Sequence, residues 1–278
     1  MEFDNSWRAL TNPGSAIDFF GPPPHQAATP LREYSVVNAW WLAELSRLVY
    51  RDDGPGAARS RDQILAGVGL CESRFVRRRN TQCAIVEPRG GAAQPVAVLV
   101  FRGTDGPGDW GTNFKTVPTE WPQGGTVHAG FKRALDGIWP DLEPLLDALD
   151  TPVFYAGHSL GGALAMLAAS RRPPLAVYTF GAPRVGDESF AMTLSDVAAY
   201  RVVNRRDSVP RLPPNVGPLR YRHAGELRAV SFGTPRKRPG RRPFPPLPGV
   251  RRSFDPPANL CDHSPVNYVA CLERNARA

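Results

Sequence analysis

Ser159 lies in the pentapeptide Gly-His-Ser-Leu-Gly, residues 157–161, which has the G-x-S-x-G spacing of a nucleophile motif. A short β-branched and aromatic run, residues 152–155, precedes it, and a run of good helix formers, residues 162–170, follows it. A strand, a sharp turn and a helix are the setting in which this pentapeptide exposes a serine hydroxyl. The two glycines keep the turn free of Cβ atoms that would obstruct it. The pattern therefore predicts nucleophilic chemistry at Ser159.

A serine hydroxyl needs a base to accept its proton, and histidine is the usual base. The chain has five histidines: His25, His128, His158, His223 and His263. When the serine lies in a strand–turn–helix motif of this kind, the expected order along the chain is serine, acid, histidine. This order favours the late His263 as the base. His25 lies in a proline-rich segment and His128 precedes the serine. We expect the His158 side chain to point away from the serine hydroxyl, and His223 to serve packing or hydrogen bonding.

The carboxylate that orients the base should follow a strand between the serine and the histidine. Asp207 meets this condition, because it comes directly after the apolar run 199–204. Asp187 and Asp196 are rivals by order, but each lies at the end of a predicted helix, where aspartate usually caps. Asp262 adjoins His263, which makes direct pairing awkward. Asp207 is the predicted acid.

Ester or amide cleavage also needs donors for the oxyanion of the tetrahedral intermediate. In this arrangement one donor is the amide that follows the nucleophile, here that of Leu160. The second comes from the loop after an early strand, where Thr104 offers an amide and a hydroxyl and Gly103 allows close approach. The loss of one such donor typically costs about 3 kcal/mol.

Strands and helices alternate along the chain, which predicts an α/β fold with a mostly parallel sheet covered by helices on both faces. The predicted strands are residues 82–87, 95–101, 152–155, 176–180 and 199–204. The predicted helices are an amphipathic one within 31–50, one over 130–149 that is kinked or broken near Pro140 and Pro144, one over 162–170, one over 188–196, and a terminal one over 264–272. We expect residues 31–278 to form a single domain.

Three segments lack this regularity. Residues 1–30 are rich in proline and glycine and are expected to form an irregular arm. Residues 105–127 form a loop with Trp110, Phe114, Val117 and Trp121 at helical spacing, interrupted by Pro118. These four side chains are either packed core or the cover of an apolar cleft. Residues 234–257 are rich in arginine and proline and predict an extended loop, either a solvated tether or a contact with an anionic membrane surface.

The composition is that of an ordinary globular protein, with 278 residues of which 42% are hydrophobic. No run of 18 apolar residues exists, so a transmembrane helix is not predicted. The N-terminal residues lack the basic and apolar regions of a secretory signal, which predicts a cytoplasmic protein, with export by another route left open. Cys71, Cys83, Cys261 and Cys271 form no C-x-x-C pair and are expected to be free thiols, Cys71–Cys83 being the alternative pairing.

Six sequence motifs in this order resemble the class 3 lipases, the α/β-hydrolase family of fungal triacylglycerol lipases. They are residues 100–105, 127–131, 156–162, 179–187, 203–214 and 262–264, and the resemblance spans about residues 34–272. The resemblance implies Ser159, Asp207 and His263 as a catalytic triad, Thr104 and Leu160 as the oxyanion hole, and residues 105–121 as a lid. The insertion at 234–257 and the lack of the fungal members' secretory signal and disulfides depart from the family pattern.

Together these observations predict a serine ester hydrolase that acts on acylglycerols or other lipid esters and needs no metal or cofactor. A phospholipase A1-like or short-chain carboxylesterase activity is the alternative, and a non-catalytic lipid-binding protein is a third hypothesis. The net charge of +8 favours anionic surfaces. Nucleic-acid binding is not expected, because the arginine-rich loop has few interleaved aromatic residues and no known module accompanies it.

Overall fold

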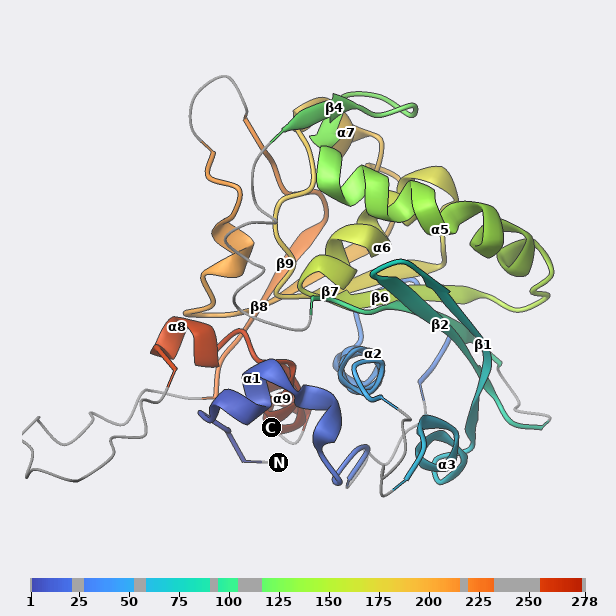
Figure 1. The fold of residues 1–278 in the computed structure, drawn as a ribbon, viewed down its shortest axis with the longest axis vertical. Coiled ribbons are helices and arrows are strands. Elements are labelled where there is room, and N and C mark those ends of the chain that lie inside the picture. Colours follow the sequence, from blue (N-terminus) through green and yellow to red (C-terminus); the bar gives the residue numbers. More distant parts are fainter. Residues whose placement is uncertain are drawn as a thin grey trace, which may run out of the picture.

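The computed structural model describes residues 2–21, 28–52, 59–90, 95–104, 117–215, 220–232 and 256–276. Its centre is a seven-stranded sheet with the order β1-β2-β3-β6-β7-β8-β9 (Figure 1). The strands are β1 (Leu70–Arg78), β2 (Thr81–Pro88), β3 (Ala97–Phe101), β6 (Val153–His158), β7 (Ala176–Phe180), β8 (Ala199–Asn204) and β9 (Glu226–Val230). The pairs β1–β2 and β2–β3 are antiparallel, and the four pairs from β3 to β9 are parallel. The predicted mostly parallel sheet is confirmed, although β1 and β9 were not predicted.

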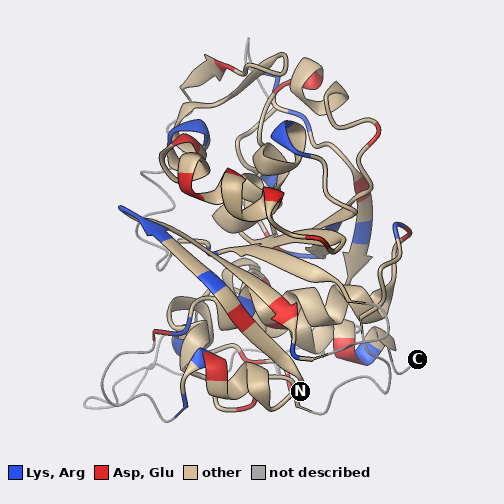
Figure 2. Cartoon of the chain, turned by 90° about the vertical axis from the view of Figure 1, so that its right-hand side faces the viewer, with Lys and Arg blue, Asp and Glu red and all other residues tan. Residues whose placement is uncertain are grey.

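Helices cover both faces of this sheet (Figure 1). One face packs against α2 (Val36–Leu48), α3 (Arg61–Ala66) and α9 (Pro265–Ala276), and the other against α5 (Ala129–Asp147), α6 (Leu160–Arg171) and α7 (Glu188–Met192). Strand β3 contributes side chains to the cores on both faces of the sheet. Val98 and Val100 belong to the core that includes α2, and Leu99 and Phe101 belong to the core that includes α5 and α6. Charged residues are absent from β3, β6 and β7, whereas the outer strands of the sheet, the helices and the loops carry them (Figure 2).

Helix α2 is buried nearly all round, which differs from the amphipathic helix that we predicted. Glu44 and Arg47 are both fully buried and form an ion pair of 2.8 Å. Arg47 also bonds the Asp18 carboxylate over 3.2 Å, and the ring of Phe19 lies 4.3 Å below its guanidinium. The polar side of α2 therefore faces the N-terminal segment, whose own polar groups replace water there.

The N-terminal segment is more regular than its composition suggests. It contains α1 (Trp7–Thr11) and the short 3-10 helix η1 (Pro13–Ser15). The side chain of Ser6 caps α1, as it accepts from the backbone N–H of Ala9 over 3.1 Å. Residues of this segment also bond the start of α9, where the hydroxyl of Ser264 donates to the carbonyl of Ala9 over 2.7 Å. The described residues of this arm therefore include two short helices that its composition did not predict, and contacts with α2 and α9 hold the arm against the body.

Helix α5 continues through both of its prolines. The helix runs from Ala129 to Asp147 and contains Pro140 and Pro144, so the predicted break does not occur. Its apolar face is completely buried, and Leu135, Ile138 and Leu142 belong to the core cluster that includes α6. This packing stabilises the helix where the prolines remove backbone donors.

The described part of the predicted loop before α5, residues 117–128, contains two short strands. Strands β4 (Pro118–Glu120) and β5 (Thr126–His128) pair antiparallel. Trp121 follows β4, is 3% exposed, and donates from Nε1 to the Ser170 hydroxyl over 2.8 Å. Trp121 is therefore packed core, one of the two roles that the sequence left open for it, rather than the cover of a cleft. Val117 is exposed, whereas Trp110, Phe114 and the insertion up to residue 255 lie outside the described residues.

The four cysteines are free thiols. In the β1–β2 hairpin, Cys71 lies opposite Glu87 and Cys83 lies opposite Val76, so the two cysteines are too far apart along the hairpin to be bridged. Burial raises the pKa of Cys83 and of Cys271 to about 12, which keeps both thiols protonated at neutral pH.

Candidate active site

Ser159 occupies the sharp turn between β6 and α6. Its backbone has φ 56° and ψ −125°, an unfavourable conformation for a residue with a Cβ atom, and its N–H donates to the carbonyl of Phe180 over 2.9 Å. A Cβ atom on Gly157 would lie 2.3 Å from the carbonyl carbon of Gly161, and one on Gly161 would lie 2.2 Å from the oxygen of Phe101. The turn therefore requires both glycines. The Ser159 hydroxyl does not cap α6, so the helix does not sequester it.

Asp207 and His263 come from distant parts of the chain, and the ring of His263 lies beside that of His158, the residue before Ser159, with 4.5 Å between the ring centroids. Asp207 follows β8, and His263 lies between α8 (Ala258–Cys261) and α9. His263 Nδ1 lies 2.8 Å from Asp207 Oδ2, and both side chains are fully buried. The backbone N–H of Val209 donates to the other carboxylate oxygen over 2.9 Å. Because an ionised carboxylate only accepts, His263 donates from Nδ1, and Nε2 of the neutral ring carries the lone pair that a base needs.

The rival carboxylates are engaged in other interactions. Asp187 caps α7, accepting from the N–H of Phe190 over 2.8 Å, and also binds Thr126. Asp262 pairs with Arg206 through two bonds of 3.0 and 3.1 Å. Asp196 lies exposed in the turns after α7. Asp207 is thus the aspartate that the described structure places against His263.

The other histidines have structural partners. His223 Nε2 lies 2.7 Å from the carbonyl of Pro210, and burial lowers the pKa of His223 to about 4, in agreement with the predicted hydrogen-bonding role. His128 caps α5, accepting at Nδ1 from the N–H of Gly130 over 3.1 Å. His25 lies outside the described residues. His158 is buried between Tyr50 and the backbone of His263, a placement that the sequence did not predict.

The segment after β3 lies directly against the elbow. A Cβ atom on Gly103 would lie 2.1 Å from the Tyr50 hydroxyl and 2.6 Å from the carbonyl oxygen of His158. The next residue is Thr104, which is partly exposed, as is Leu160 in the first turn of α6. The first amides of α6 point away from the helix and form a favourable environment for negative charge. A carbonyl oxygen bound beside Ser159 would therefore meet backbone donors as it gains charge.

Sequence reasoning missed three residues that complete this cluster. The hydroxyl of Tyr268 lies 2.6 Å from Asp207 Oδ2 and 3.1 Å from the backbone N of Asn204. Tyr50, in the turn after α2, bonds His158 over 3.1 Å. Gly181 has a positive φ, and a Cβ atom there would lie within 3.0 Å of His263, Asp207 and Tyr268. A tyrosine five positions after His263 was visible in the sequence, but nothing there indicated its partner.

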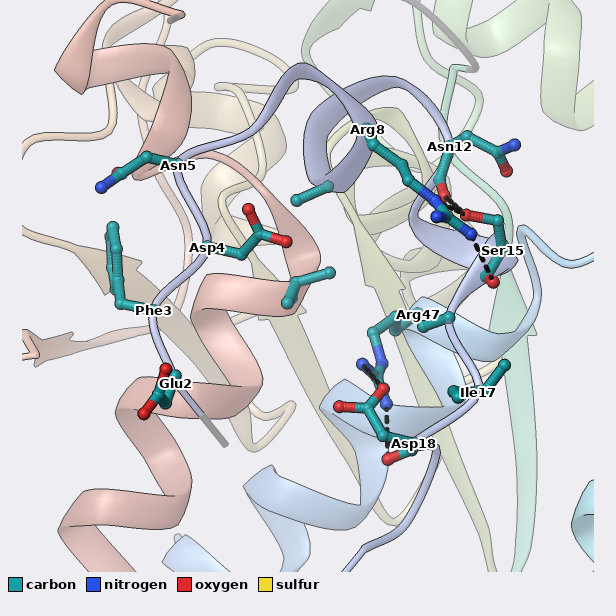
Figure 3. Close-up of a pocket in the computed structure, with 13 residues that line it drawn as sticks. Glu2, Phe3, Asp4, Asn5, Arg8, Asn12, Ser15, Ile17, Asp18 and Arg47 are labelled. Atoms are coloured by element: carbon teal, nitrogen blue, oxygen red, sulfur yellow. Dashed lines mark hydrogen bonds and ion pairs between the residues drawn. The ribbon is translucent and has the colours of Figure 1, made fainter.

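A hollow of about 520 Å³ lies apart from this cluster, where the N-terminal segment crosses α2 and α9 (Figure 3). It is lined by Phe3, Asp4, Arg8, Asp18 and Arg47 among others, and by none of Ser159, Asp207 and His263. Its charged groups have partners within it, since Arg8 donates to Ser15 over 2.9 Å and Arg47 pairs with Asp18. Among the described residues, no group of His, Cys, Asp and Glu has the arrangement of a metal site. No described helix is long and apolar enough to cross a membrane.

Comparison with known proteins places these features in a family. The family model "Lipase (class 3)" matches residues 98–217, which hold the segment after β3, the elbow and Asp207. Over these residues the chain is a member of the class 3 lipase family. A relative named secreted mono- and diacylglycerol lipase 1, from Fusarium solani, is 38% identical over 144 residues, which are 47% of this chain and 43% of the relative. The lipase of Rhizomucor miehei is 34% identical over 163 residues, 52% of this chain and 44% of that enzyme.

The solved structures agree with the fold. The native propeptide complex of Rhizomucor miehei lipase matches with a TM-score of 0.57 at 28% identity, covering 69% of this chain and 66% of that one. The chain thus has the α/β-hydrolase fold that we predicted. It spans less than half the length of the sequence relatives reported above.

The predicted cytoplasmic location is wrong. The relative from Fusarium solani is named as a secreted enzyme, which contradicts the location inferred from the N-terminal sequence. That inference depended only on the composition of the first residues. This composition does not determine the compartment in which the folded protein acts.

Proposed function

We propose that the chain is a serine ester hydrolase that cleaves acyl-ester bonds of acylglycerols or other lipid esters. The buried bond of 2.8 Å between His263 Nδ1 and Asp207 Oδ2 is the observation that supports this proposal most directly, and the ring of His263 lies beside that of His158, the residue before Ser159. Membership of the class 3 lipases and the names of the relatives support an acylglycerol as the substrate.

In the proposed mechanism His263 accepts the proton of the Ser159 hydroxyl, whose oxygen attacks the ester carbonyl. Asp207 holds the imidazole ring and stabilises its positive charge. The amides of Thr104 and Leu160 donate to the oxyanion. His263 then gives its proton to the leaving alcohol, and water hydrolyses the acyl-enzyme by the reverse proton route.

The first test is hydrolysis of short- to long-chain p-nitrophenyl esters by the wild type and by Ser159→Ala. We expect the Ser159→Ala variant to lose activity roughly 10⁴-fold or more. The matched control is Ser189→Ala, which changes an exposed serine of α7 and should leave the rate unchanged. Retained activity in Ser159→Ala, or lack of labelling of Ser159 by a fluorophosphonate, would overturn the proposal.

Rates of hydrolysis of lipid emulsions then identify the class of ester that the protein prefers. Triolein is compared with phosphatidylglycerol and phosphatidylcholine at low and high salt. The proposal expects triolein or a partial glyceride to be preferred. A preference for phosphatidylglycerol that disappears at high salt would instead indicate phospholipase activity directed by the net charge of +8. Activity on short p-nitrophenyl esters alone would indicate a carboxylesterase.

A further inference from the structure

Asp207 Oδ2 is shared by two side chains of the α9 region. His263 Nδ1 lies 2.8 Å from this oxygen and the Tyr268 hydroxyl lies 2.6 Å from it. The Tyr268 hydroxyl also accepts a bond of 3.1 Å from the backbone N–H of Asn204. Because the phenol has one proton and Asn204 occupies its acceptor side, that proton points at the carboxylate. The directions of all three bonds are therefore determined.

Hydrogen bonds of the surrounding residues fix the positions of Asp207, Tyr268 and His263. The N–H of Asp207 donates to the carbonyl of Asn204 over 3.0 Å, so the strand end that binds Tyr268 also anchors Asp207. Asn267 Nδ2 donates to the carbonyl of Cys261 over 2.8 Å, which ties the first turn of α9 to α8 on either side of His263. Gly181 leaves just enough room, since a Cβ atom there would lie 2.6 Å from Asp207 Oδ2.

We propose that Tyr268 is a positioning residue for the proposed triad, one that orients the Asp207 carboxylate and takes up part of the charge that faces His263. The proposal depends on the proposed function, because it concerns the same histidine acting as a base. Tyr268 is fully buried, and its hydroxyl bonds Asp207 and the backbone of Asn204. It therefore acts on the proposed base through Asp207.

Sharing one oxygen between two donors has a defined consequence. A hydrogen bond from the phenol withdraws negative charge from Oδ2, and the carboxylate then stabilises a protonated imidazole less. The charge on the oxygen that faces the imidazole is therefore smaller than it would be on an unshared carboxylate. Burial and the adjacent Asp207 raise the pKa of Tyr268 well above 10, so the phenol remains a donor over the whole working range.

The test is Tyr268→Phe, which removes one oxygen atom and keeps the ring. We expect kcat to fall roughly 10-fold, the effect typical of one lost bond to a charged group, with KM unchanged. The acidic limb of the kcat/KM profile should move to higher pH, because the unshared carboxylate stabilises the protonated imidazole better. The matched control is Tyr178→Phe, a fully buried tyrosine on β7 whose hydroxyl bonds the backbone of Glu33 and Ser35. This variant should leave the acidic limb of the kcat/KM profile at its wild-type pH.

A second variant covers the case in which Tyr268→Phe does not fold. A fluorotyrosine at position 268 keeps the hydroxyl and makes it a stronger donor, so the acidic limb should move to lower pH. An unchanged limb in both the phenylalanine and the fluorotyrosine enzymes, or an equal shift in Tyr178→Phe, would overturn the proposal. If Ser159→Ala were active, the proposed function would fail first; if it is inactive and the limb does not move, only the role of Tyr268 fails.

Discussion

The imidazole of His158 lies 2.6 Å, at Nε2, from the backbone carbonyl oxygen of His263. A carbonyl only accepts, so His158 donates at Nε2 and accepts at Nδ1 from the Tyr50 hydroxyl, 3.1 Å away. Burial, together with the nearby His263, lowers the pKa of His158 well below 6.5, which keeps the ring neutral and this tautomer in place. The residue before the elbow serine therefore connects the end of α2 to the loop that carries the proposed base.

Replacement of His158 should damage both stability and rate. In His158→Phe the buried Tyr50 hydroxyl and the carbonyl of His263 lose their partner, which should lower the free energy of unfolding by about 1–3 kcal/mol. The His263 loop also loses an anchor, so kcat should fall. Urea unfolding and p-nitrophenyl ester hydrolysis measure the two effects.

The control for this change is His223→Phe, which breaks the bond to the backbone carbonyl of Pro210 and leaves the bonds of His158 in place. It should lower stability and leave kcat intact. Equal kcat values for His158→Phe and the wild type would contradict the anchoring role of His158.

Gly103→Ala should impair the proposed oxyanion hole. The added Cβ atom would lie 2.6 Å from the carbonyl oxygen of His158 and 2.1 Å from the Tyr50 hydroxyl, so the backbone before Thr104 must move. Displacement of one oxyanion donor typically lowers kcat by about 10²–10³-fold. Gly137→Ala in α5 is the matched control, because nothing lies within 4 Å of its Cβ position. A Gly103→Ala enzyme with wild-type kcat would place the oxyanion donor elsewhere.

The buried Glu44 predicts a pH dependence of stability. Desolvation, only partly offset by Arg47, raises the pKa of Glu44 from 4.5 to about 7. Between these values the folded state holds a proton that the unfolded chain has released, so the free energy of unfolding falls as the pH rises through this window. The full effect corresponds to about 3 kcal/mol.

Urea unfolding at about pH 5 and about pH 7.5 tests this dependence in the wild type and in Glu44→Gln, which cannot ionise. His158 acts in the opposite sense, because its lowered pKa contributes stability that is lost as the pH falls below 6.5. Subtraction of the Glu44→Gln curve removes that contribution. A difference between the two proteins that is constant with pH would mean that Glu44 is ionised throughout.

The residues that we propose for the chemistry could be named from the sequence, and the signal for Ser159 is local. The elbow around Ser159 depends on two glycines within two residues of the serine, and β6 and α6 follow from apolar runs on either side of it. Asp207 and His263 were predictable from residue type and chain order. Local patterns of this kind depend on backbone conformation, which the nearest residues decide.

The tertiary structure decided what each buried polar group contacts. Glu44 and Arg47 looked like the solvent side of an amphipathic helix, yet a segment more than 20 residues earlier covers them, with Phe20 donating to Glu44 over 3.1 Å. Trp121 looked like a lid residue and lies in the core. Tyr268, His158 and Gly181 acquire their roles only from partners brought in by other elements. Sequence periodicity shows which side chains avoid water, but only the packed chain decides which groups take the place of water around the polar ones.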